Sequence, residues 1–238
     1  MDSPRKALVL LSGGIDSTTC TVMACREFGP ENVLALSLIY GQKHAKEIAA
    51  AREVTKYLGI KDHIIHQLPD IFQGGGSTLI DKDRPNPETT YEELRKSKGV
   101  SPTYVPFRNA NLLSVATTIS LVKGADTIFY GAHAEDARNW AYPDCTPEFN
   151  GAMANAIYIG SYMKVRLLTP LQWLTKSEVV ALGKKIGTPF ELTWSCYNGS
   201  EKACGVCPTC MGRLHAFDEN GLRDPIDYET IIQPSLQK

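Results

Sequence analysis

Two stretches of the sequence combine residue types that bind ligands, and the first is Ser12-Gly13-Gly14-Ile15-Asp16-Ser17. It follows an apolar run of strand length and precedes a segment of helical pattern, so the N–H groups of the turn and of the helix N-terminus attract an anion. Two adjacent glycines let a phosphate approach the backbone, and Ser12 and Ser17 add hydroxyl donors. Asp16 suits a Mg²⁺ ion that bridges it to the phosphates. The stretch predicts a nucleotide-phosphate site, although a plain strand-to-helix turn also uses Gly and Ser.

The second stretch is a cysteine cluster formed by Cys196, Cys204, Cys207 and Cys210. Four thiols at this spacing are enough for a closed tetrahedral Zn²⁺ site, which clamps a loop and leaves no open position for catalysis. An iron–sulfur cluster is the alternative, because C-x2-C-x2-C also opens ferredoxin-type ligand runs, but the C-x3-C-P that would follow is absent.

Composition excludes several classes of protein. The 238 residues carry 25 basic and 26 acidic side chains, a net charge of −1, which argues against a nucleic-acid binder that works by bulk charge. No apolar run approaches the roughly 20 residues that span a bilayer, and none resembles a signal peptide. Three of the seven cysteines form the C-x2-C-x2-C run, which favours metal binding over disulfides in a reducing compartment. We therefore expect a cytoplasmic protein without a membrane partner.

Strand-like and helix-like segments alternate along the chain. This order predicts an α/β protein with a doubly wound, mostly parallel sheet. The expected strands are 6–11, 33–40, 62–68, 127–130 and 165–168, and the expected helices are 17–28, 43–58, 110–122 and, from a capping box, 175–186. We expect an α/β nucleotide-binding domain over residues 1–190 and a zinc-binding segment with a tail over 191–238.

Residues 69–102 interrupt this alternation with three consecutive glycines, several prolines and a charged stretch at 88–98. We expect a mobile excursion with one short helix. It is either a lid over the site or a solvated insertion without a function.

The phosphate-binding patterns G-x-x-x-x-G-K-[ST] and G-x-G-x-x-G are both absent, so the lysine that contacts β and γ phosphates in the first class is missing. S-G-G-x-D-S instead resembles the loop of the pyrophosphate-releasing ATPases, a superfamily with an adenine nucleotide alpha hydrolase-like fold. This resemblance implies that ATP is cleaved between its α and β phosphates and that AMP passes to an oxygen of the substrate. It implies these nucleotide-binding residues: Leu11, Ser12, Gly13, Gly14, Ile15, Asp16, Ser17 and Thr18.

Further motifs together resemble one family of that superfamily, the 7-cyano-7-deazaguanine synthases. The motifs are S-G-G-x-D-S-T-T-C at 12–20, Y-G-Q-x-H at 40–44, V-P-x-R-N at 105–109, Y-P-D-C at 142–145, P-L at 170–171 with Lys176 and Glu178, and C-Y-N-G at 196–199 before the cysteine run. The resemblance spans residues 6–213. Y-P-D-C and C-Y-N-G distinguish this family from its thiolating and amidating relatives.

The resemblance implies an enzyme that converts 7-carboxy-7-deazaguanine, ammonia and ATP into the 7-cyano base, with a structural Zn²⁺ and as a homodimer. By position it assigns catalytic roles to Asp16, Arg108 and Lys176, and substrate binding to His44, Asn109, Asp136, Asp144 and Lys164. A cation in the first turn of a helix costs roughly 0.3–1 kcal/mol, so an anionic partner would explain Lys176, as would a plain surface position. A hydrogen-bonded loop histidine is an equally simple interpretation of His44 or of His133.

The sequence departs from the family pattern at Phe107, where the family has glycine, and at 136–142, which is longer than usual. Two other functions remain open at this point. One is another enzyme of the superfamily, a tRNA sulfurtransferase or a small-acid amidase, and the acidic charge balance disfavours the first. The other is a zinc-knuckle binding module that has kept an inactive loop.

Overall fold

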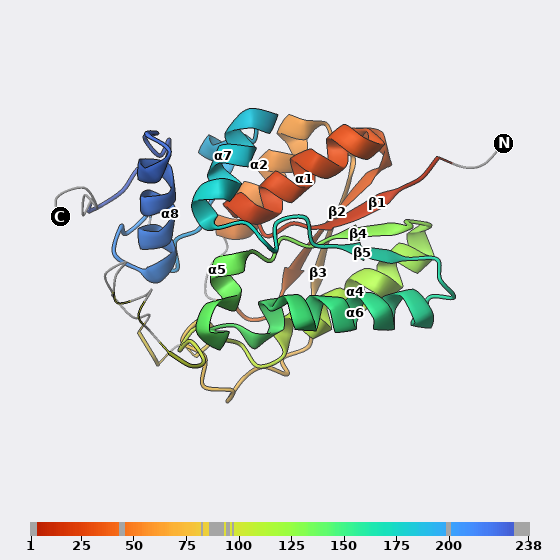
Figure 1. Cartoon of the computed structure of the whole chain (residues 1–238), viewed down its shortest axis with the longest axis horizontal. Helices are drawn as coiled ribbons and strands as arrows, with labels where there is room; N and C mark the ends of the chain where they lie inside the picture. Colours follow the sequence, from red (N-terminus) through yellow and green to blue (C-terminus); the bar gives the residue numbers. More distant parts are fainter. Residues whose placement is uncertain are drawn as a thin grey trace.

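The computed structural model describes residues 4–42, 46–81, 83–85, 93, 96, 98–198 and 201–230. In this part of the chain, five parallel strands form one sheet in the order β3-β2-β1-β4-β5 (Figure 1). The strands are β1 (Ala7–Leu10), β2 (Val33–Ile39), β3 (Asp62–Gln67), β4 (Thr127–Phe129) and β5 (Arg166–Leu168). The expected doubly wound parallel sheet is confirmed.

The central strand β1 is buried on both faces because helices cover the sheet from both sides. Ala7 and Val9 belong to one hydrophobic core, and Leu8 and Leu10 to the other. The period of two along a strand sends alternate side chains to opposite faces. The apolar run at 7–10 therefore supplies both cores at once.

Figure 1 shows α1 (Ile15–Phe28), α2 (Lys46–Leu58) and α7 (Lys176–Ile186) on one face of the sheet, and α4 (Arg108–Lys123) and α6 (Pro147–Gly160) on the other. The capping box predicted for α7 is present, since Thr175 and Glu178 cap each other's backbone N–H groups. The sequence did not predict α6. Its Asn150, Gly151 and Asn155 are weak helix formers, and packing of the helix against the second core outweighs their low propensity.

The order of the strands reverses between β1 and β4. The chain leaves β1 toward α1 on one face, whereas it leaves β4 toward α6 on the opposite face. In sheets of this kind the two loops diverge and open a crevice at the carboxyl ends of the strands. The short helix α5 (Ala134–Ala137) lies beyond β4 at this edge.

The described ends of the 69–102 segment pack into the protein. Phe72, Leu79 and Ile80 are buried in the core, and the N–H of Thr78 donates to the carbonyl of Pro102 at 3.0 Å. These ends are therefore part of the folded domain rather than a solvated excursion. The charged stretch at 88–98, within the segment expected to contain one short helix, falls mostly outside the described residues.

The C-terminal segment contains α8 (Pro208–Glu219), which packs against α7. The ring of Phe217 meets that of Phe190 edge to face, with centroids 5.1 Å apart, and both residues belong to the core beside α1. Among the described residues, no helix is both long and apolar enough to cross a membrane.

Candidate active site

A cavity of about 370 Å³ opens at the carboxyl ends of β1, β2 and β4. Its wall combines residues from distant parts of the chain, among them the 11–17 loop, the segment from β4 through α5, the start of α4 and residues 194–209. The cavity therefore occupies the crevice expected at the point of strand reversal, where ligands bind in sheets of this kind.

The 11–17 loop is held by close packing against α2. Gly13 has φ +89°, and a Cβ at this position would lie 2.4 Å from the carbonyl oxygen of Glu47. Gly14 lines the cavity as the N-cap residue of α1, and no side chain caps that helix end. The first N–H groups of α1 can therefore receive an anion. The two glycines serve different purposes, since Gly13 fits the loop against α2 and Gly14 faces the ligand space.

Five of the eight residues assigned to nucleotide binding line the cavity. They are Leu11, Ser12, Gly14, Asp16 and Ser17. The hydroxyls of Ser12 and Ser17 lie 3.0 Å apart and bond to each other, which closes the loop. Gly13, Ile15 and Thr18 are buried in the interior and maintain the shape of the loop.

Asp16 is the electrostatic centre of the site. The ammonium of Lys176 lies 2.5 Å from its Oδ2, and Nε2 of His133 lies 3.9 Å from the same atom. Burial by itself would raise the pKa of Asp16, but the charges of Lys176 and His133 outweigh it and lower that pKa. The other oxygen, Oδ1, is buried without a hydrogen-bond partner in the described structure. An oxygen without a partner in a charged site fits a bound cation.

The position of Lys176 is now explained. It begins α7, where the macrodipole disfavours a cation, and Asp16 is the anionic partner that offsets the cost. The two residues are 160 positions apart in the chain. The lysine is thus a site residue and not a plain surface residue.

Arg108 and Asn109 also line the cavity, at the start of α4. Nη1 of Arg108 donates to the hydroxyl of Tyr40 at 3.0 Å, and the guanidinium lies over the Tyr40 ring. Burial opposes the charge of Arg108, yet Tyr40 and Cys145 raise its pKa, so Arg108 stays a cation. It is suited to bind a carboxylate or a phosphate.

Asp144 does not line the cavity, contrary to its assignment as a substrate-binding residue. It is buried, and its Oδ2 accepts a hydrogen bond from the N–H of Asn109 at 3.0 Å. A carboxylate at this position satisfies the N-terminus of α4 and positions Arg108 and Asn109.

Lys164 also lies away from the cavity. It is exposed between α6 and β5, at the amino end of β5, whereas the cavity lies at the carboxyl ends of the strands. Asp136 does line the cavity, and its Oδ2 lies 3.3 Å from Nε2 of His133. His44 lies outside the described residues.

The structure places Glu47, Trp194 and Thr209 in the cavity wall, and the sequence did not single out these three residues. It also brings to the cavity Tyr40, His133 and Tyr142, from motifs that the sequence did single out. Tyr40 and His133 follow the ends of β2 and β4, at the edge where ligands bind, whereas Glu47 lies in the first turn of α2. For Trp194 and Thr209 the sequence offered no signal, because their nearness to the phosphate loop arises only from the fold.

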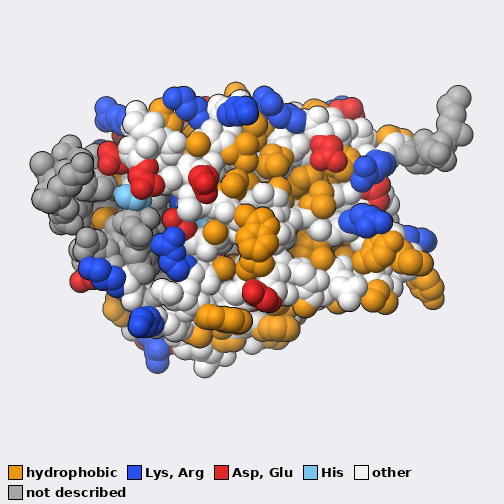
Figure 2. Space-filling model, viewed as in Figure 1, with side chains coloured by type: hydrophobic (Ala, Val, Ile, Leu, Met, Phe, Trp, Pro, Cys, Tyr) orange, Lys and Arg blue, Asp and Glu red, His pale blue; other side chains and the backbone are white. Residues whose placement is uncertain are grey.

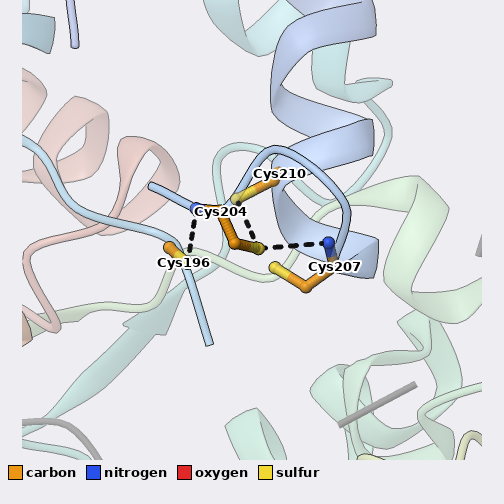
Figure 3. Close-up of side chains that lie close together, drawn as sticks. All are labelled: Cys196, Cys204, Cys207 and Cys210. Carbon is orange, nitrogen blue, oxygen red and sulfur yellow. Dashed lines mark hydrogen bonds between the residues drawn. The ribbon is translucent and has the colours of Figure 1, made fainter. Parts of the chain in front are cut away.

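The cysteine cluster forms a closed site of single-ion dimensions. The sulfur atoms of Cys196, Cys204, Cys207 and Cys210 all lie within 4.8 Å of one another, and all four residues are buried (Figure 3). Sulfurs around one tetrahedral Zn²⁺ lie roughly 3.8 Å apart, given a Zn–S bond of about 2.3 Å. The N–H of Cys204 donates to the sulfur of Cys196 at 3.3 Å, a contact that favours a thiolate. The donor set and its spacing therefore fit one metal ion.

Two hydrogen bonds join the cysteine segment to the cavity. The N–H of Trp194 donates to the carbonyl of Gly13 at 2.9 Å, and the hydroxyl of Thr209 donates to the carbonyl of Ser195 at 2.7 Å. Ser195 and Thr209 line the cavity themselves. The metal site thus lies directly behind one wall of the pocket.

Comparisons with known proteins agree with this architecture. The family model described as "Queuosine biosynthesis protein QueC" matches residues 6–221. A 7-cyano-7-deazaguanine synthase of Koribacter versatilis is 44% identical over 225 residues, which cover 94% of this chain and 93% of that protein. One of Methanoculleus marisnigri is 43% identical over 228 residues, which cover 94% of this chain and 99% of that protein.

Among solved structures, the U34-tRNA thiolase NcsA from Methanococcus maripaludis is similar with a TM-score of 0.51. It is 16% identical, and the match covers 92% of this chain and 68% of that one. At this identity the likeness shows the fold alone.

Proposed function

Since the chain belongs to the queuosine biosynthesis QueC family, we propose that it is an ATP-dependent ligase that converts 7-carboxy-7-deazaguanine and ammonia into 7-cyano-7-deazaguanine. The observation that carries the proposal is the meeting of a bare helix N-terminus, the Asp16–Lys176 pair and Arg108 in one cavity. This combination can hold a nucleotide pyrophosphate and a substrate carboxylate side by side.

In the first step, the N–H groups at the start of α1 and the hydroxyls of Ser12 and Ser17 bind the β and γ phosphates. Arg108 holds the substrate carboxylate against the α phosphate, which the carboxylate oxygen attacks. Lys176 lies where charge develops on the leaving pyrophosphate and stabilises it. Ammonia then displaces AMP from the acyl adenylate and gives the amide.

A second activation completes the reaction. An amide oxygen leaves as water only with difficulty, so we propose that the same loop adenylates it from a second ATP. Loss of AMP and of the amide protons then gives the nitrile. His133 and Asp136, with Asn109, contact the deazaguanine ring and keep it bound between the two steps.

The donor atoms favour Mg²⁺ at Asp16 and Zn²⁺ at the cysteines. Oδ1 of Asp16 has no partner among the described residues and suits Mg²⁺, which would neutralise the pyrophosphate charge. The short sulfur separations favour one Zn²⁺ over an iron–sulfur cluster, because a [4Fe–4S] cluster binds its cysteines through different irons and separates them further. That zinc would be structural, since the four thiols occupy every position.

We also propose a cytoplasmic homodimer with no nucleic-acid or membrane partner. Ile159, Tyr162 and Met163 at the end of α6 are exposed by 66%, 86% and 65%, and Figure 2 shows apolar side chains gathered in that region. These side chains lie beside β5, an edge strand of the sheet. A partner subunit would cover them. Light scattering of the Ile159→Glu variant, which should be monomeric, tests this proposal.

A tRNA sulfurtransferase or an amidase is not favoured, because the relatives above share the synthase name over nearly their whole length. The decisive experiment is mass spectrometry of the product formed from ATP, Mg²⁺, ammonium and 7-carboxy-7-deazaguanine. The expected product is the nitrile, with AMP and pyrophosphate and no ADP. The amide given with ATP but without ammonium should also yield the nitrile. A binding module would release no pyrophosphate.

A further inference from the structure

The cavity wall contains a carboxylate without a role so far, Glu47 in the first turn of α2. Its backbone carbonyl lies against Gly13, so this turn packs directly on the phosphate loop. The position of Glu47 is therefore fixed relative to the phosphate loop.

Glu47 is close enough to Arg108 and Tyr40 for their charges to interact. The charge of Glu47 raises the pKa of Tyr40, and the charge of Arg108 acts on Glu47. Arg108 is the group proposed to hold the substrate carboxylate. A ligand of Glu47 would thus lie near the carbon that is activated.

The carboxylate of Glu47 is not committed to another role within the described part of the chain, where it has no hydrogen bond or ion pair. Burial raises its pKa to about 7, although Arg108 opposes this shift. At neutral pH the group can therefore both bind a cation and accept a proton. The other charged or titratable groups around the cavity are Asp16, His133, Glu135, Asp136, Arg138, Lys176, Tyr130, Tyr142, Tyr197 and Cys145.

The proposed reaction needs such a group. Ammonia in neutral water is mostly ammonium, which, like other ammonium groups, has no free electron pair. It must lose a proton before it can attack the acyl adenylate. Asp16 is a weak base because its pKa is lowered and Lys176 occupies it, and Asp136 is paired with His133.

We propose that Glu47 binds the ammonium ion beside the acyl adenylate and removes its proton, a role that rests on the proposed function. The proton passes to the Glu47 carboxylate, and the freed electron pair of nitrogen forms the C–N bond. The C–O bond to AMP then breaks, and its electron pair stays on the phosphate oxygen. The second nitrogen proton passes to solvent as the amide forms.

The Glu47→Gln variant tests this role because it keeps the shape of the side chain and removes the base and the charge. We expect the KM for ammonium to rise at least tenfold and turnover at a fixed ammonium concentration to fall about a hundredfold or more. Exchange of labelled pyrophosphate into ATP with the acid substrate alone should be unchanged within twofold. Conversion of the amide to the nitrile without ammonium should also be unchanged within twofold.

The matched control is Glu53→Gln, which removes an exposed carboxylate from the same helix and should behave as wild type. Glu47→Asp should recover part of the lost ammonium affinity. A fall in pyrophosphate exchange or in amide conversion equal to the fall in the full reaction would overturn the role, as would an unchanged KM for ammonium. If the wild type itself makes no nitrile, it is the proposed function that fails.

Discussion

The phosphate loop and the C-terminal segment each contain a close ion pair, and the two pairs are built differently. Arg213 and Asp224 are 1% and 2% exposed in their side chains, whereas Lys176 and Asp16 are 15% and 22% exposed. The Arg213 guanidinium donates to Asp224, Thr193 and the carbonyl of Phe190. Asp16 keeps one oxygen without a partner.

The difference separates a structural pair from a functional one. A buried pair whose hydrogen bonds are satisfied holds segments together. Here it joins α8 to residues 190–193 before the cysteine cluster and to Asp224 after α8. A partly open pair with an unused oxygen retains the capacity to bind a ligand. The degree of hydrogen-bond satisfaction, more than the charge, therefore indicates which site does chemistry.

The largest effect should follow loss of the metal ion proposed at the cysteine cluster. Cys204→Ser removes one of four ligands, and because metal binding at such a site is largely folding energy, we expect destabilisation by about 5 kcal/mol or more. Zinc analysis and thermal unfolding of the same sample check this. Cys25→Ser on α1 is the control and should keep both zinc content and stability. Brown protein that contains iron would refute the zinc assignment.

Breaking the buried pair should be nearly as damaging. Asp224→Asn leaves Arg213 charged and without its counterion in the interior, at a cost of about 3–5 kcal/mol in the free energy of unfolding. The matched control is Asp126→Asn, which breaks the exposed pair with Arg5 and should cost less than about 1 kcal/mol. Urea denaturation measures both. Equal losses of stability in the two variants would contradict the expected difference between a buried and an exposed ion pair.

Breaking the Asp16–Lys176 pair should instead affect activity much more than stability. Asp16→Asn should lower turnover a hundredfold or more, which corresponds to about 2.7 kcal/mol in transition-state free energy. The reason is that the variant loses the carboxylate proposed to hold the cation that would neutralise the pyrophosphate charge. Stability should fall by less than in Asp224→Asn, because the Lys176 and Asp16 side chains are 15% and 22% exposed and water partly solvates the ammonium that loses its partner. Turnover measurements and urea unfolding on the same preparation test the effect on activity and the effect on stability. Near-normal turnover would remove Asp16 from the mechanism.

The smallest effect concerns Phe107, whose φ of +53° lies in the left-handed region that favours glycine. Phe107→Ala loses the edge contact with Phe149 and keeps the strain, whereas Phe107→Gly loses the contact and relieves it. The glycine variant should therefore be about 1 kcal/mol more stable than the alanine variant, the reverse of the usual order within a helix. Paired thermal melts decide this, and a more stable alanine variant would exclude strain at the site.

The sequence alone was sufficient for features that depend on neighbouring residues. The apolar runs and their order predicted the parallel sheet, since a strand buried on both faces needs apolar residues at consecutive positions. S-G-G-x-D-S predicted the glycine turn before α1, and the cysteine spacing predicted four thiols close enough to hold one ion, because each set of residues lies within a short stretch. The helix α6 was missed, since its weak local propensity is outweighed by packing.

Tertiary structure decided which side chains meet across the chain. Lys176 reaches Asp16 from 160 positions away, and Glu47 enters the cavity because α2 packs on Gly13. The charges of Asp144 and Lys164 suit substrate binding, but neither residue lines the cavity. Asp144 is buried behind the cavity wall, and Lys164 lies at the amino end of β5. Residue type and spacing fix what a side chain can do. Only the common direction of the strands, which gathers their carboxyl ends at one edge, determines which of these side chains share a site.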